Sequence, residues 1–180
     1  MKRIFSLLTA TILFATGFTA EAQKDKSKRK SEPAEVKAIL SNGGAEITIN
    51  YSRPSINGRE IGKDLEPMEG KIWRTGANEA TTFESSKDVK INGVFLPAGK
   101  YSFFTIFNGR LATLIFNKTW QQWGAYDYKE SEDQLRVEAK VYANEPATEK
   151  LTINVDNDGN ATIKWGGKKV QFKIDQPGKN

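Results

Sequence analysis

The 180-residue chain contains no cysteine and no histidine. Without cysteine there can be no disulfide framework, no thiolate nucleophile and no cysteine-linked lipoprotein anchor. Without histidine there can be no Ser-His-Asp triad and no histidine-ligated zinc site. Any catalysis would have to use Asp, Glu, Lys, Tyr, Ser, Thr or Arg, and we expect neither a metal site nor a cofactor.

Long hydrophobic runs are also scarce. The most apolar stretch, residues 4–18, follows two basic residues and precedes the small-residue motif Ala20-Glu21-Ala22. It is interrupted by polar residues and is shorter than the roughly 20 residues of a membrane-spanning helix. The pattern predicts a secretory signal peptide over residues 1–22, cleaved after Ala22. We therefore expect a periplasmic or secreted protein, not a lipoprotein, with no membrane span after cleavage.

The net charge of +5 belongs mainly to the N-terminal tail. Residues 23–32 contribute +3 and the signal peptide contributes +1, which leaves +1 for residues 33–180. The domain therefore lacks the basic footprint of a nucleic-acid-binding protein, and we expect no nucleic-acid partner. The basic tail, residues 23–33, is too polar to form a core and is predicted to be disordered.

Period-two alternation of apolar and polar residues begins after the tail. Residues 45–52 alternate strictly, whereas residues 103–107 are apolar on both faces, which predicts a central strand covered on both sides. Asn92-Gly93 is a strong signal for a tight hairpin. Turn signals recur about every 8–12 residues. The sequence predicts an all-β fold, an antiparallel β-sandwich of about nine or ten short strands, as one domain over residues 34–176.

The stretch of residues 71–83 concentrates directed polar chemistry around Gly76, which we expect to permit a bend. Arginine can bind carboxylate or phosphate groups in a bidentate manner, so converging arginines here would form an anion site. The alternative is structural: Arg74 pairs with Glu79 and ties the loop to the sheet. Both interpretations stay open, and the candidate binding residues are Arg53, Arg59, Trp73, Arg74, Asn78, Glu79 and Trp123.

Aromatic residues and carboxylates suggest two further roles. A platform for a sugar or a peptide could be formed by aromatic rings, or these rings could close the core; they are Trp73, Trp120, Trp123, Tyr126 and Tyr128. Glycoside hydrolysis needs two carboxyl groups at a defined separation across a cleft. Such a pair could come from Glu79 with Glu84, or from Asp64 with Glu66.

The segment Asp156–Asn160 has the spacing of oxygen ligands that begins a calcium-binding loop. A calcium loop would need a glutamate at its end, where this chain has Trp165. The segment therefore predicts a hairpin turn.

Five motifs occur in one order along the chain: Ile49–Pro54, Gly58-Arg59, Lys71–Asn78, Leu96–Ser102 and Trp123–Ala125. On these motifs, and over residues 33–175, the chain resembles the bacterial family catalogued as domain of unknown function 2911 (DUF2911). The resemblance implies secretion in Gram-negative bacteria and carries no activity, substrate or site.

We therefore predict a secreted or periplasmic domain that acts as a non-catalytic binding or interaction module through its Arg, Glu and aromatic cluster. Two alternatives stay open: a carboxylate-based hydrolase acting on a glycan or a similar substrate, and a purely structural domain. The partner would be a small molecule, a glycan or a protein.

Overall fold

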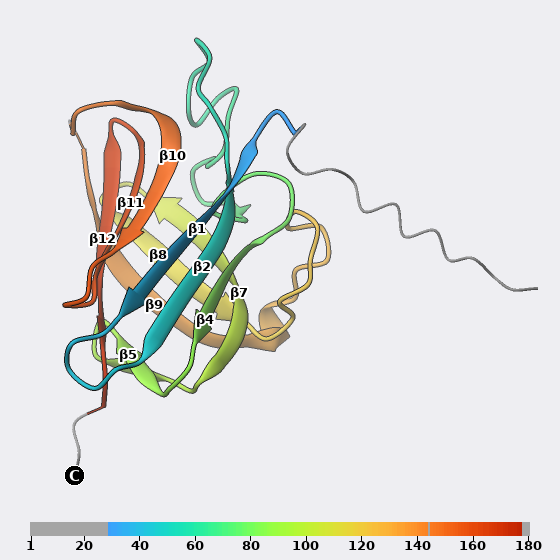
Figure 1. Ribbon diagram of the computed structural model, residues 1–180. Helices are drawn as coiled ribbons and strands as arrows, with labels where there is room; N and C mark the ends of the chain where they lie inside the picture. The colour runs from blue at the N-terminus through green and yellow to red at the C-terminus, as the bar shows by residue number, and fades with distance from the viewer. Residues whose placement is uncertain (1–28, 144, 178–180) are drawn as a thin grey trace, which may run out of the picture.

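The computed structural model describes residues 29–143 and 145–177 (Figure 1). The predicted signal peptide, residues 1–22, and residues 23–28 of the basic tail lie outside these ranges. The described end of the tail differs from the expected disorder, because the first strand begins at Glu32 and pairs there with Arg53. This pairing extends the domain toward the N-terminus by two residues relative to the sequence prediction.

The described chain is built from β-strands and one short 3-10 helix, η2. In chain order the elements are β1 (Glu32–Ile39), β2 (Glu46–Arg53), β3 (Ile72–Trp73), β4 (Thr81–Ser85), β5 (Val89–Ile91), β6 (Val94–Leu96), β7 (Gly99–Asn108), β8 (Leu111–Asn117), η2 (Glu130–Glu132), β9 (Asp133–Tyr142), β10 (Thr148–Val155), β11 (Asn160–Gly166) and β12 (Lys168–Asp175). The predicted all-β antiparallel fold is confirmed. The described chain has twelve strands, more than the expected nine or ten, and three of them, β3, β5 and β6, are only two or three residues long.

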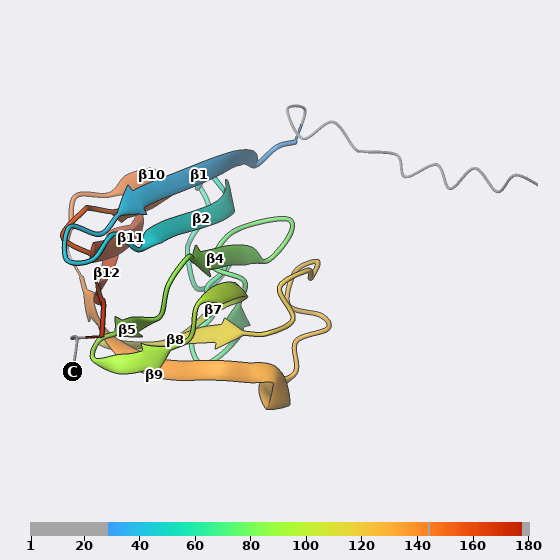
Figure 2. The same ribbon diagram turned by 60° about the horizontal axis from the view of Figure 1, so that its bottom comes forward.

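One continuous sheet with the strand order β1-β2-β4-β7-β8-β9-β12-β11-β10 forms the body of the domain. It curls until β1 and β10 lie side by side, as both ribbon views show (Figures 1 and 2). Ser55, just after β2, forms an isolated antiparallel bridge with Lys150 of β10. The two layers of the expected sandwich are thus two walls of a nearly closed barrel, a shape that leaves little unpaired strand edge.

Alternation along the strands determines which side chains enter the barrel. The apolar residues of the alternating 45–52 segment, Ala45, Ile47, Ile49 and Tyr51, are all buried. In β7, Phe103 belongs to the main core, whereas Phe104 packs on the outside of the sheet with Ala80 and Ile115. The prediction that β7 is covered on both faces is therefore confirmed, and the segment after β8 provides the outer cover through Tyr128.

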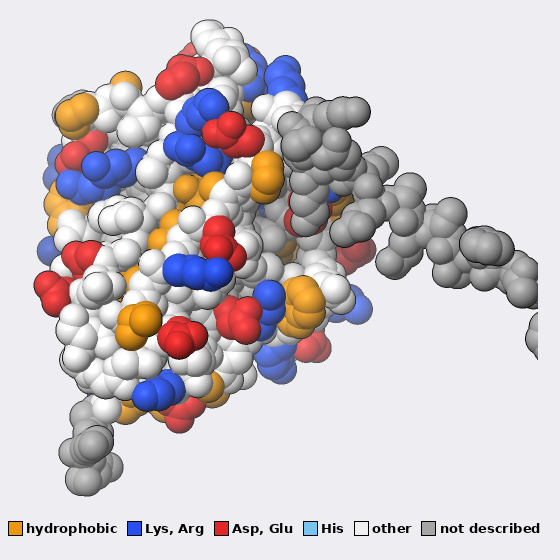
Figure 3. Space-filling view, in the orientation of Figure 1, with side chains coloured by type: hydrophobic (Ala, Val, Ile, Leu, Met, Phe, Trp, Pro, Cys, Tyr) orange, Lys and Arg blue, Asp and Glu red, His pale blue; other side chains and the backbone are white. Residues whose placement is uncertain are grey.

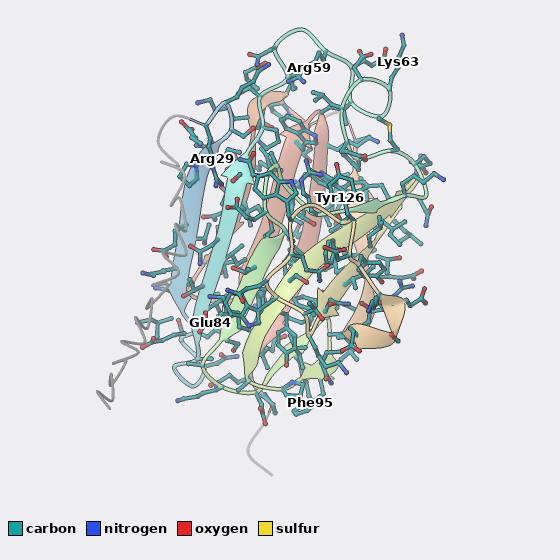
Figure 4. The ribbon with its side chains drawn as sticks, turned by 90° about the vertical axis from the view of Figure 1, so that its right-hand side faces the viewer. Arg29, Arg59, Lys63, Glu84, Phe95 and Tyr126 are labelled. Atoms are coloured by element: carbon teal, nitrogen blue, oxygen red, sulfur yellow. The ribbon has the colours of Figure 1, made fainter. Side chains whose placement is uncertain are left out.

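Residues 54–71 connect β2 to β3 and cover one end of the barrel (Figure 1). The main-chain N–H of Ile56 donates to Glu149 O at 2.9 Å, and the indole of Trp165 donates to Glu66 O at 2.8 Å. Figure 4 shows Arg29 toward the same end of the barrel as Arg59. The end of the tail and this long loop lie side by side, because Lys30 and Arg59 line the same pocket.

Candidate functional site

The residues that follow β3 make a tight reversal supported from within. The indole N–H of Trp73 donates to Gly76 O at 3.1 Å. Thr75 and Asn78 adopt positive φ angles of 52° and 60°. Gly76, which we expected to supply the bend, is needed for a different reason: a Cβ there would lie 3.0 Å from the main-chain oxygen of Ser52. The reversal sends the side chains on its two sides in different directions.

Arg74 and Glu79 do not form the ion pair that the sequence suggested. The Nη1 atom of Arg29 lies 2.8 Å from Oε1 and 2.6 Å from Oε2 of Glu79. Asn78 donates from Nδ2 to Ser31 O at 3.2 Å, so it also binds the end of the tail. Arg74 makes no ion pair with any described residue. The reversal places Glu79 in one pocket and Arg74 in another.

The segment between β8 and η2, residues 118–129, forms the outer wall of the larger pocket. Trp123 forms an antiparallel bridge with Glu79, and the N–H of Ala80 donates to Gln122 O at 2.9 Å. The buried Nε2 of Gln122 donates to Thr119 O at 2.5 Å and lies 3.2 Å from Ser102 Oγ. These bonds fix Trp123 beside Glu79.

Tyr128 anchors the far end of this wall. Its ring packs edge-on against Phe104 with centroids 5.1 Å apart, and its hydroxyl donates to Asp133 Oδ2 at 2.6 Å. Burial, followed by this bond to the carboxylate, raises the pKa of Tyr128 to about 12. The phenol therefore stays protonated at neutral pH. Tyr128 is a structural residue rather than part of a binding platform, and Tyr126 points into solvent with 84% of its surface exposed.

The larger pocket, which we call the tryptophan cleft, has a volume of about 660 Å³. It lies between residues 118–129 and the outer face of β1, β2 and β4. Trp120 and Trp123 are 39% and 54% exposed, so part of each ring is accessible. The polar residues lining the cleft include Asn50, Glu79, Lys100, Gln121 and Gln122. The Oε1 atom of Gln122 is buried and has no hydrogen-bond partner among the described residues.

Arg29 occupies part of this cleft. Its guanidinium carbon lies 5.8 Å from the centroid of the Trp123 ring while Nη1 contacts both oxygens of Glu79. Only 17% of the Arg29 side chain is exposed. The tryptophan cleft thus holds a guanidinium group between a carboxylate and an aromatic ring.

The smaller pocket has a volume of about 200 Å³ and is lined by Arg59 and Arg74 together with Lys30 and Glu66. Arg53, the third arginine that we expected here, instead closes the barrel: its Nε donates to Leu151 O at 2.9 Å and its Nη2 donates to Thr152 Oγ1 at 3.1 Å. Two of the three predicted arginines therefore converge.

The predicted carboxylate pairs are not brought together in either pocket. Glu84 pairs with Lys100 at 3.2 Å and does not line the tryptophan cleft. Glu66 lines the smaller pocket without Asp64. Among the described residues of the tryptophan cleft, Glu79 is the one carboxylate. Residues 29–143 and 145–177 contain no group of three or more side chains placed to hold a metal ion.

Sequence reasoning missed Arg29 and the amide side chains of the cleft. Arg29 lies in a run of charged residues of the kind found in solvated tails. No pattern in the neighbouring residues therefore predicts its contact with Glu79 and Trp123. Asn50 and Gln122 are single amides in different segments, and pairing between Ala80 and Gln122 brings the second one to the site. Trp73, a predicted binding residue, is 1% exposed and belongs to the core.

The fold and its pockets define a class: an all-β domain in the form of a nearly closed antiparallel barrel, with two polar pockets on its surface. The family described as Protein of unknown function (DUF2911) matches residues 31–174, and the chain belongs to that family. The resemblance seen in the sequence motifs is thus confirmed. A search of curated proteins and a search of solved structures each returned no match. Within the described part of the chain, no helix has the length and apolar character to cross a membrane.

Proposed function

We propose that this protein is a non-catalytic binding module that takes an arginine side chain of an extended protein segment into the tryptophan cleft. One observation carries the proposal: the cleft already holds the guanidinium of Arg29 between Glu79 and Trp123. The family match begins at residue 31, so it includes the walls of the cleft but not this arginine. Arg29 therefore acts as an internal stand-in for the arginine of a partner.

The internal contact is weak enough for a partner to displace it. An ion pair at a partly exposed carboxylate contributes about 0–1 kcal/mol. The cation–π contact with the half-exposed Trp123 ring adds about 0.5–2 kcal/mol, depending on how far the guanidinium is desolvated. Glu79 keeps 39% of its side chain exposed, so the pair is within reach of solvent and of a competing ligand. A partner segment would add contact with Trp120, which is 39% exposed in the cleft.

A second candidate ligand is a glycan, favoured by the two accessible tryptophan rings and the amides that surround them. Flat aromatic faces offer contact area to sugar rings at a low cost in side-chain entropy. The arginine ligand is favoured because the cleft already holds a guanidinium in contact with both Glu79 oxygens and beside the Trp123 ring. A hydrolase is the less favoured reading, since the described cleft residues supply one carboxylate and not two.

The ligand is tested by titrating the purified protein with an arginine-containing peptide while tryptophan fluorescence is recorded. In the Arg29→Ala background, Glu79→Gln is expected to weaken binding by about two- to fivefold, because the ion pair with the guanidinium of the ligand is lost. Arg29→Ala is expected to strengthen binding by about two- to fivefold, because the internal competitor is removed. The two substitutions therefore change the affinity in opposite directions.

Glu145→Gln is the matched control. Glu145 forms a half-buried ion pair with Lys169 at 2.8 Å and does not line the tryptophan cleft. Its replacement should leave peptide affinity unchanged. Saturable binding of a neutral oligosaccharide with no response to the arginine peptide would replace the proposed ligand by a glycan. If neither ligand changes the fluorescence of the protein or of Arg29→Ala, the binding proposal is wrong.

We propose further that the module works outside the cytoplasm, on the basis of the signal pattern in residues 1–22. Mass spectrometry of the protein expressed with its full sequence should find Gln23 as the first residue. An intact Met1 in the membrane fraction would contradict this location. The result does not bear on the ligand of the cleft.

A further inference from the structure

The smaller pocket is not used by the proposed function. Its walls come from the loop at residues 54–59, from the segment 74–77 and from residues 30–31. Pro54, Leu65 and Ala77 also line it, so part of its surface is apolar. At about 200 Å³ it can hold a small ligand or the end of a larger one.

Positive charge dominates the lining of this pocket. Lys30, Arg59 and Arg74 face a single carboxylate, Glu66, which leaves an excess of two positive charges among the lining residues. Oε2 of Glu66 accepts a hydrogen bond from the N–H of Met68 at 2.8 Å. Across residues 29–143 and 145–177, no ion pair joins any of these three cations to an acidic side chain. Their charge is therefore left for a ligand to neutralise.

The two guanidinium groups are placed differently. Arg59 donates from Nε to Ile56 O at 3.0 Å and from Nη2 to Ser55 O at 2.7 Å, so main-chain carbonyls orient its side chain without cancelling its charge. The Nε of Arg74 is buried and has no hydrogen-bond partner in the described structure. A buried N–H group of a charged side chain is stabilised when it gains an acceptor. Arg74 thus has an unmet donor within a positively charged pocket.

We propose that this pocket binds the carboxylate of a small ligand, with Arg74 as the principal contact. The planar fork of a guanidinium matches a carboxylate in a bidentate geometry. The volume of about 200 Å³ suits a small carboxylate, and Pro54, Leu65 and Ala77 in the lining suit an apolar body next to it. The site lies on the opposite side of the 75–78 reversal from Glu79, so it is separate from the tryptophan cleft.

The test follows the Nε–H signals of arginine in proton–nitrogen correlation spectra of the isotope-labelled protein. Acetate is added at constant ionic strength by replacing chloride. The Nε–H signal of Arg74, assigned by its loss in Arg74→Lys, is expected to shift and to saturate. Arg110, an exposed arginine that lines neither pocket, provides an internal reference that should not shift.

Arg74→Lys is expected to weaken acetate binding at least about tenfold, because a point charge replaces the planar fork. Binding by the variant is followed on the main-chain amide of Ala77, and Arg110→Lys is the matched control that should bind as the wild type does. If Arg74→Lys fails to fold, Arg59→Gln on the exposed loop provides the second variant, and it too is expected to weaken acetate binding.

The absence of a saturable shift at Arg74 would overturn the site. Tighter binding of inorganic phosphate than of acetate would overturn its assignment to carboxylates. Neither result depends on the arginine ligand proposed for the cleft.

Discussion

Replacing Trp73 by alanine is expected to lower the free energy of unfolding by about 3–5 kcal/mol, the usual cost of removing a large buried aromatic side chain. Trp73 is 1% exposed, and its ring centroid lies 6.2 Å from that of Phe107. Its indole N–H also donates to Gly76 O within the reversal. The substitution therefore removes both core packing and a bond that shapes the segment carrying Arg74 and Glu79.

The measurement is urea unfolding followed by far-ultraviolet circular dichroism, which does not rely on tryptophan emission. Trp73→Phe is the matched variant: it keeps an aromatic ring in the core and loses the bond to Gly76. It should lose less stability than Trp73→Ala and still weaken ligand binding at both pockets. A transition midpoint for Trp73→Ala equal to that of the wild type would contradict the role assigned to this residue.

Replacing Gly159 by alanine is expected to cost about 3 kcal/mol or more, the sum of a left-handed backbone penalty and an overpacking penalty. Gly159 lies in the turn between β10 and β11 with a φ of 82°. A Cβ at this position would stand 1.9 Å from the main-chain oxygen of Ile174, and only separation of the β10–β11 turn from β12 could relieve that clash. Such movement would strain the bond from the N–H of Ile174 to Gly159 O, which is 2.8 Å long.

Gly93→Ala separates the two contributions. Gly93 has a nearly identical φ of 85°, but no atom lies within 4 Å of the position its Cβ would take. Its substitution should cost only the backbone penalty of about 1–2 kcal/mol. Thermal unfolding of both variants gives the comparison. Equal losses of stability would show that the contact between Gly159 and Ile174 is looser in solution than in the structure.

The proposed sites share a dependence on the end of the basic tail. Arg29 enters the tryptophan cleft, whereas Lys30 lines the smaller pocket and Ser31 accepts a hydrogen bond from Asn78. The segment at residues 29–31 therefore contacts the domain on both sides of the 75–78 reversal. This explains physically why a charged segment next to the first strand takes a defined place on the domain.

Local sequence patterns determined the fold class. The strict alternation in residues 45–52 requires one buried and one accessible face, which a strand provides. Asn92 and Gly93 both adopt positive φ, as the Asn-Gly pair predicted for a tight hairpin. The apolar residues on both faces of residues 103–107 correctly indicated a covered central strand. The family was also accessible from sequence, because its motifs are contiguous runs of residues.

Only the tertiary structure decided which charged groups meet. Arg53 was predicted to lie with Arg74 but donates to Leu151 across the closing seam of the barrel, and Glu79 pairs with Arg29 from the tail. These partners are separated by 98 and 50 residues in the chain, so no local pattern records them. Long charged side chains can satisfy several partners at similar free energy. Closure of the sheet sets the direction of the Arg53 side chain. The positive φ angles at Thr75 and Asn78 set the direction of the Glu79 side chain.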